Sequence, residues 1–132
     1  MKRFFYVLSL LILTAGIASS QNVQKKKKSF AVVGYDTHDF GKIKKTDGPV
    51  THIFKIKNEG DSSLAILTAK ASCSCTTVTH SKEPIAPGSD NGEVKVTFNP
   101  EHHKFLTIKT ISVYDNERKD PLKLFIKAEI IE

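Results

Sequence analysis

Two cysteines separated by one residue, Cys73 and Cys75, carry the clearest chemical potential of the chain. They are its only cysteines, and on an extended backbone both side chains point to the same side. Two residues of extended chain span roughly 6.6 Å, at the upper edge of the Cα separation that a disulfide tolerates. A bridge between them therefore requires a bent backbone, and a strained bridge of this kind is readily reduced and exchanges with partner thiols.

Three interpretations of the pair stay open. The cysteines can be small apolar fillers or a local staple at the end of a strand, or a thiol–disulfide redox pair. They can also be soft-metal ligands, since two thiolates suit Cu(I) or half of a tetrahedral zinc shell. His80, His102 or His103 would have to complete a zinc site, but their spacing does not show that they converge. We expect no obligatory cofactor, with Cu(I) or zinc as the metals that suit this pair.

The remaining residues give no catalytic pattern. Hydroxyl side chains cluster between residues 72 and 79, but no partner base stands near them in the sequence. The glycines form no phosphate-binding motif, and no carboxylate pair is marked out for acid–base chemistry. We therefore predict a protein that is not an enzyme and has no catalytic residues.

The elements that position the cysteines read as successive short strands with turn residues between them, which predicts an all-β sandwich. Apolar and polar residues alternate most clearly over residues 50–58, 93–99 and 122–131. Residues 63–69 are apolar on both faces, which predicts a strand near the centre of a sheet. Over residues 105–114 the apolar phase changes, and a β-bulge near Lys109 and Thr110 would account for the change.

The N-terminal segment has the pattern of a secretory signal peptide over residues 1–20: a basic start, an apolar run and small residues. The apolar run is shorter than the roughly 20 residues of a spanning helix, so no membrane span is expected in the mature chain. No cysteine lies near the end of this run, which argues against a lipoprotein. We expect a soluble, exported protein, periplasmic or extracellular, with a flexible leader at 21–29 and a β-sandwich domain at 30–132.

The charge is concentrated outside the expected domain. The formal net charge of the 132 residues is +6, and the leader carries four consecutive lysines: Lys25, Lys26, Lys27 and Lys28. The run is either a tether to an anionic surface or a solvated tail. Because the expected domain is close to neutral, we predict no nucleic-acid partner.

Six short segments follow in order from Phe30 onward: residues 40–43, 54–60, 71–76, 84–88, 94–98 and 111–116. Their order and spacing resemble the family called domain of unknown function 1573, found in exported bacterial proteins. The resemblance implies an immunoglobulin-like, seven-stranded antiparallel β-sandwich, similar to pilus-chaperone and major sperm protein domains. Those relatives mostly bind proteins or act as scaffolds. In the family the residue between the cysteines is usually Gly, whereas here it is Ser74.

The resemblance and the residues together predict a non-enzymatic module that binds or scaffolds a protein of the bacterial envelope. Such sandwich domains can add a partner's strand to an exposed sheet edge. The alternative function is thiol–disulfide exchange or copper handling by Cys73 and Cys75. The sequence leaves open the identity of the partner, the oxidation state of the cysteines and the oligomeric state.

Overall fold

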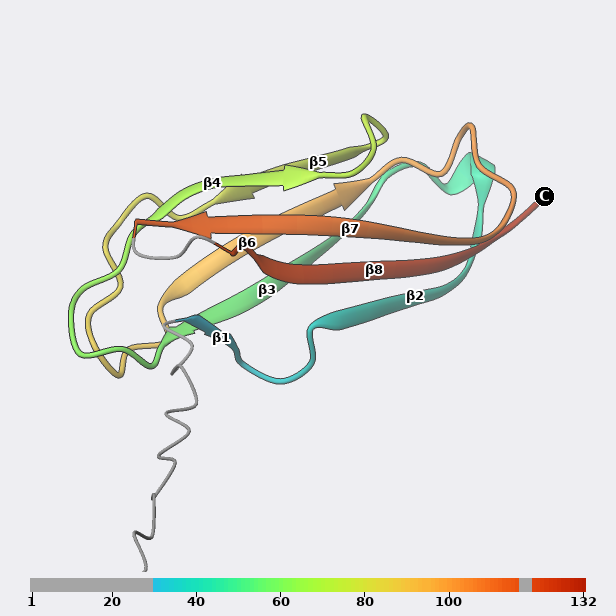
Figure 1. Cartoon of the computed structure of the whole chain (residues 1–132). Helices are drawn as coiled ribbons and strands as arrows, with labels where there is room; N and C mark the ends of the chain where they lie inside the picture. The colour runs from blue at the N-terminus through green and yellow to red at the C-terminus, as the bar shows by residue number, and fades with distance from the viewer. Residues whose placement is uncertain (1–29, 117–119) are drawn as a thin grey trace, which may run out of the picture.

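The computed structural model describes residues 30–116 and 120–132 (Figure 1). The expected signal peptide at 1–20, the leader at 21–29 and its lysine run lie outside the described residues. Within the described ranges, no helix has the length and apolar character needed to cross a membrane.

Over the described residues, eight strands form two four-stranded sheets (Figure 1). The first sheet has the order β1 (Phe30–Val32), β3 (Val50–Asn58), β6 (Gly92–Phe98), β5 (Thr76–His80). The second has the order β2 (Thr37–Lys44), β8 (Leu122–Ile131), β7 (Phe105–Asp115), β4 (Ile66–Ala71). One short 3₁₀ turn, η1 (Lys45–Asp47), joins β2 to β3. The predicted immunoglobulin-like β-sandwich is thus confirmed.

The sandwich differs from the expected seven antiparallel strands in two details. The N-terminal segment divides into β1, which pairs with β3, and β2, which pairs with β8 in the other sheet. This division raises the number of strands to eight. The β2–β8 pair is parallel, whereas the remaining pairs between the described strands are antiparallel.

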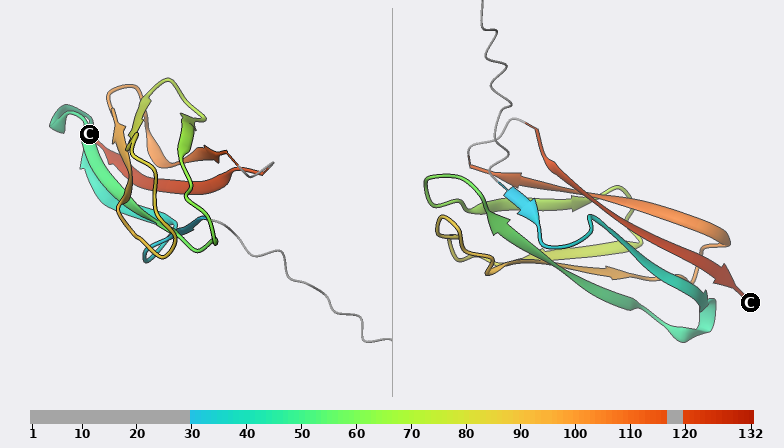
Figure 2. Two further views of the ribbon diagram at one scale, coloured as in Figure 1. Left: turned by 90° about the vertical axis from the view of Figure 1, so that its left-hand side faces the viewer. Right: turned by 90° about the horizontal axis from the view of Figure 1, so that it is seen from below.

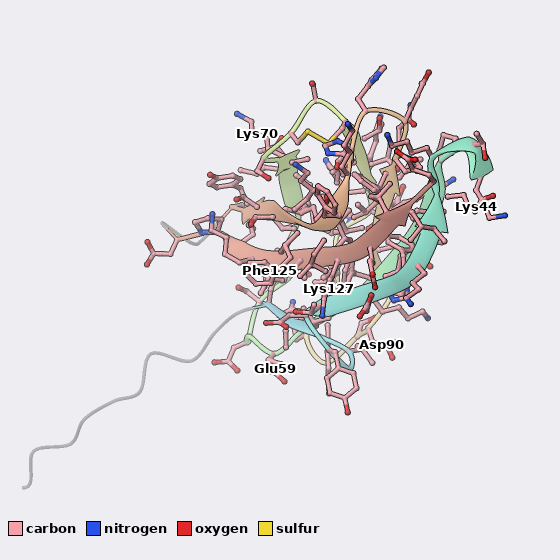
Figure 3. The ribbon with its side chains drawn as sticks, turned by 90° about the vertical axis from the view of Figure 1, so that its right-hand side faces the viewer. Lys44, Glu59, Lys70, Asp90, Phe125 and Lys127 are labelled. Atoms are coloured by element: carbon pink, nitrogen blue, oxygen red, sulfur yellow. A yellow bond between two sulfur atoms is a disulfide. The ribbon has the colours of Figure 1, made fainter. Side chains whose placement is uncertain are left out.

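The core lies between the sheets and follows the alternation of the sequence. On β3, Phe54 and Ile56 are buried while the lysines between and after them are exposed. On β6, Val94, Val96 and Phe98 are buried in the same way. Full burial of one such side chain contributes about 1.5–3 kcal/mol. Figure 3 shows side chains filling the space between the sheets, with charged groups such as Lys44 and Lys70 at the rim.

Two details of the strand prediction are wrong. Strand β4 is an edge strand rather than a central one, and Leu67 on it is 62% exposed. The predicted bulge near Lys109 is absent, because β7 pairs with β8 in one unbroken register from Phe105 to Val113. The apolar phase changes because Leu106 and Ile108 lie on the outer face, where both are 58% exposed.

A buried asparagine joins the loops at one end of the sandwich. Asn58 is fully buried, and its side-chain amide donates hydrogen bonds to the carbonyl oxygens of Ser62 and Ile85, both at 2.8 Å. Its side-chain oxygen accepts a hydrogen bond from the Gly60 amide at 2.8 Å. Because buried polar groups need partners, this side chain fixes the relative positions of the two loops.

The opposite end of the sandwich carries the cysteines. The β4–β5 turn, the β6–β7 loop, η1 and the C-terminus all lie at this end, and the views in Figure 2 agree with Figure 1. Segments far apart in the sequence are thereby brought together around the cysteine pair.

Candidate functional site

The cysteine pair lies in the tight turn that carries the chain from β4 in one sheet to β5 in the other. Backbone hydrogen bonds hold both ends of this turn: the Ser72 amide donates to the Thr110 carbonyl at 2.9 Å, and the Thr76 amide donates to the Cys73 carbonyl at 3.2 Å. Thr76 is buried, and Cys75 packs partly against the core. The turn is therefore anchored to the body of the sandwich.

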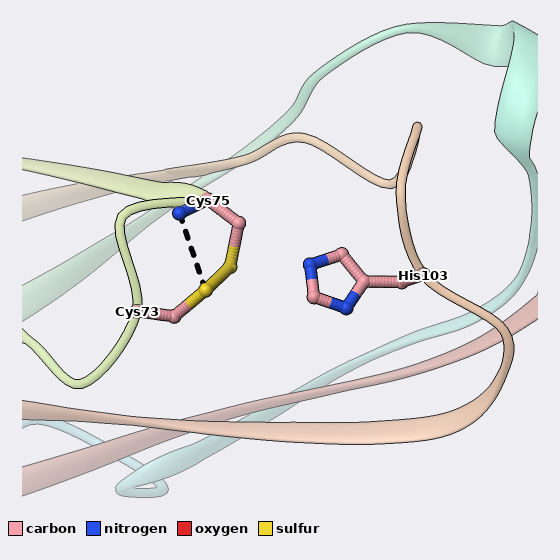
Figure 4. Close-up of side chains that lie close together, drawn as sticks. All are labelled: Cys73, Cys75 and His103. Atoms are coloured by element: carbon pink, nitrogen blue, oxygen red, sulfur yellow. Dashed lines mark hydrogen bonds between the residues drawn. A yellow bond between two sulfur atoms is a disulfide. The ribbon is translucent and has the colours of Figure 1, made fainter.

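Cys73 and Cys75 form a disulfide with a Cα–Cα distance of 5.2 Å. This distance is shorter than the extended-chain span, so the backbone bends as a bridge requires. The Cys75 amide donates a hydrogen bond to the Cys73 sulfur at 3.2 Å inside the ring (Figure 4). Ser74 does not adopt a positive φ, which explains why the ring closes without the glycine usual in the family.

A second loop, between β6 and β7, faces the disulfide. The backbone amide of Asn99, at the start of this loop, donates a hydrogen bond to the Cys75 carbonyl oxygen at 3.0 Å. This bond joins the two loops directly. The His103 amide donates to the Pro100 carbonyl at 3.0 Å, and the His103 ring lies 5.2 Å from the ring of Phe98. These contacts orient the His103 side chain toward the cysteines (Figure 4).

The result is a cluster of three potential ligands. The sulfurs of Cys73 and Cys75 and a ring nitrogen of His103 all lie within 4.8 Å of one another. All three side chains are half-buried and line an open pocket of about 560 Å³. Burial, then the charge of Lys109 and then that of His102, lower the pKa of His103 below its usual value of 6.5. The neutral imidazole therefore dominates near pH 7 and has a lone pair for a proton or a metal.

The other histidines singled out in the sequence do not join this cluster. His102 is exposed and lines the same pocket, but its neighbour His103 is the one that reaches the cysteines. His80 lies at the far end of β5, and its ring nitrogen is 2.9 Å from the Ser81 carbonyl oxygen. The structure thus brings together two cysteines and one of the three candidate histidines.

A histidine pair that sequence reasoning missed lies between the two sheets. His52 of β3 stacks on His38 of β2 with ring centroids 3.7 Å apart. Burial and the nearby His38 lower the pKa of His52 below 6.5. The sequence does not show this pair, because the contact between β2 and β3 arises only in the folded chain.

An apolar surface at the start of β7 was also missed. Phe105 is 78% exposed and has φ of +59°, a value that bulky residues rarely adopt. Together with Leu106 and Ile131 it lines a groove of about 610 Å³, flanked by Lys45 and Lys104. The apolar phase change along residues 105–114 was the signal of this surface, since it marks side chains on the outer face.

Comparison with known structures supports the fold. A crystal structure of a protein of unknown function from Porphyromonas gingivalis W83 is 19% identical, with a TM-score of 0.62 over 76% of this chain. The match spans 46% of that protein, so this chain corresponds to just under half of its length. The PapD-like domain 7 of human CEP192 is 10% identical, with a TM-score of 0.53 over 79% of this chain and 86% of that domain.

A major sperm protein family member from C. elegans, WR4, is 13% identical, with a TM-score of 0.51 over 80% of this chain and 100% of that protein. At these identities the three structures show a common fold and no more. Among functionally curated proteins, none matches the chain. The family model described as "Protein of unknown function (DUF1573)" matches residues 31–130. Because that match covers most of the sequence, the chain belongs to the DUF1573 family.

Proposed function

We propose that this protein is an exported, non-enzymatic β-sandwich that binds an extended segment of a partner protein along the outer edge of β5. The single observation that carries the proposal is that β5 lies at the edge of its sheet. Strand β5 pairs with β6 on one side, and on the other side no strand of the described residues pairs with it. An unpaired edge of this kind is a template for a partner strand.

The register identifies the backbone groups that a partner would meet. Opposed residues of an antiparallel pair alternate between hydrogen-bonded and non-hydrogen-bonded pairs. The Asn99 amide bonds the Cys75 carbonyl, and the Ser81 amide bonds the Glu93 carbonyl, so the odd-numbered residues between them face β6. The amides and carbonyls of Val78 and His80 therefore point outward.

The composition of β5 favours strand addition. Its five residues include three threonines and a valine, which have high β-propensity, and no Asp, Glu, Lys, Arg or Pro. Edge strands are usually protected by such charges, by prolines or by bulges. Strand β2 has this protection, since it carries three charged residues and a register shift between Asp39 and Lys42. Strand β4 carries Lys70, and β1 is only three residues long.

Export belongs to the proposal and rests on the pattern of residues 1–20. Intact-mass measurement on protein from the cells that produce it tests this part. We expect a mature chain that begins after Ala18 or after Ser20, where small residues precede the cleavage points. A full-length chain that starts at Met1 would refute export by cleavage.

Proline substitution at the edge tests the binding proposal. In Val78→Pro the lost amide is one that points outward, so the hydrogen bonds to β6 stay while the edge is blocked. Val78→Ala is the matched control, because it loses the same partly buried side chain and keeps the amide. A photo-crosslinking residue in place of the exposed Thr79 captures the partner in living cells.

We expect defined crosslinks in the parent and in Val78→Ala, reduced at least tenfold in Val78→Pro. Circular dichroism confirms that each variant is folded. Equal crosslinking of the proline and alanine variants would refute binding at this edge. Absence of any specific crosslink in the parent would refute the binding function at β5 altogether.

A further inference from the structure

We propose that Cys73, Cys75 and His103, after reduction of the disulfide, form a three-coordinate site for Cu(I). The inference is independent of strand addition at β5. It starts from the distances between the three ligand atoms, which all lie within 4.8 Å of one another. Three ligands spread evenly around a metal at about 2.3 Å lie about 4 Å apart. The imidazole therefore has to approach by less than about 1 Å, while the two sulfurs separate once their bond is broken.

The site is held by backbone contacts rather than by the disulfide alone. The Thr76 amide closes the cysteine turn on the Cys73 carbonyl, and the Asn99 amide joins the histidine loop to the Cys75 carbonyl. Neither hydrogen bond involves a sulfur atom, so both remain when the thiols are reduced. The ligands consequently start close to their binding positions, which lowers the ordering cost of binding.

The donor set favours Cu(I). Thiolates are soft ligands that select Cu(I), zinc or iron–sulfur clusters, and imidazole suits copper as well as zinc. Zinc takes four ligands, either all from the protein or three from the protein and a water, whereas the described residues gather three ligands here. Besides the three ligands, the polar residues that line the pocket carry hydroxyl groups, one side-chain amide and the exposed imidazole of His102. None of the lining residues carries a carboxylate, a ligand that zinc also accepts. Cu(I) needs fewer ligands than zinc, so three soft or intermediate donors satisfy it.

A dithiol reductant makes the two thiols available by thiol–disulfide exchange. One thiolate of the reductant attacks a sulfur of the disulfide, which breaks the Cys73–Cys75 bond and forms a mixed disulfide. The second thiol of the reductant resolves this intermediate and leaves as an intramolecular disulfide. Two electrons and two protons have then passed to the cysteines. When Cu(I) binds, the two thiol protons are released to solvent, and the metal keeps its oxidation state.

Anaerobic titration tests the site directly. Reduced and desalted protein is titrated with Cu(I) in competition with bicinchoninate, beside the oxidised protein. We expect one Cu(I) per reduced chain and none on the oxidised chain. Loss of a residue that only hydrogen-bonds to a metal ligand typically lowers the affinity for the metal 10–100-fold. Loss of a ligand itself should cost at least as much. Removal of a ligand in His103→Gln should therefore weaken binding at least tenfold, whereas the matched control His80→Gln should bind like the parent.

X-ray absorption on the copper-loaded parent needs no variant and should show two sulfur ligands and one nitrogen ligand. Three results would overturn the proposal: equal copper binding by oxidised and reduced protein, unchanged affinity in a folded His103→Gln variant, or a copper shell without nitrogen. Stoichiometric binding of Zn(II) in place of Cu(I) by the reduced chain would also overturn it.

Discussion

Replacement of Asn58 by alanine should be among the most damaging single changes in the domain. The side chain is fully buried and makes three hydrogen bonds, to the carbonyls of Ser62 and Ile85 and from the amide of Gly60. A hydrogen bond contributes about 1 kcal/mol net, so the loss of three lowers the free energy of unfolding by about 3 kcal/mol. For a domain of this size that corresponds to a fall in Tm of roughly 12–24 °C.

Asn58→Asp tests the direction of the hydrogen bonds. The aspartate keeps an acceptor for the Gly60 amide but replaces the amide donor with an oxygen that faces two carbonyl oxygens. Its cost should therefore equal or exceed that of the alanine variant. The matched control is Asn91→Ala, an exposed asparagine whose side-chain oxygen accepts one hydrogen bond, from Ser89. Its effect should stay within about 0.5 kcal/mol.

The assay is urea and thermal unfolding followed by circular dichroism, for the parent and the three variants under one buffer. If Asn58→Ala unfolds within about 1 kcal/mol of the parent, the hydrogen-bond account of this loop junction is refuted. A fall of similar size in Asn91→Ala would show that the loss does not depend on burial.

Three further predictions concern packing, pH and the disulfide. Gly92→Ala should lower the free energy of unfolding by about 1–3 kcal/mol in urea denaturation, since the new methyl would press on Ile85 and lie 2.9 Å from the Ile56 carbonyl oxygen; an unchanged midpoint would contradict this. Because the pKa of His52 is lowered in the folded state, the unfolded chain binds more protons below pH 6.5, and stability should fall as pH drops below that value. Unfolding of His52→Gln across this range should show a weaker pH dependence, and an identical dependence would refute the assignment. Reduction of the disulfide should cost only about 1.6 kcal/mol by the chain-entropy model for a loop of three residues, so circular dichroism of the reduced chain should show a folded domain.

Much of the fold could be predicted because the sequence alternates wherever one strand face is buried. Strands β3, β6 and β8 follow this rule, and their buried residues lie on the expected faces. The rule failed where apolar residues face solvent, as Leu67 does on β4 and Leu106 does on β7. Alternation cannot distinguish an apolar side chain in the core from one on an exposed surface.

The candidate site could be predicted only in part. The close spacing of Cys73 and Cys75 marked them from the sequence alone. The selection of His103 over His80 depends on the loop after β6, whose hydrogen bonds to Pro100 and to the cysteine turn join segments distant in sequence. The burial of Asn58 could not be predicted either, because it follows from loops that meet only in the folded chain.

Hydrogen exchange at the amides of β5 tests the central claim most directly. In the free protein we predict slow exchange at Thr77 and Thr79, which face β6, and fast exchange at Val78 and His80, which face outward. In the complex with the crosslink-identified partner, the amides of Val78 and His80 should become as protected as those of their neighbours. Slow exchange at Val78 in the free protein, or no added protection in the complex, would contradict partner binding at this edge.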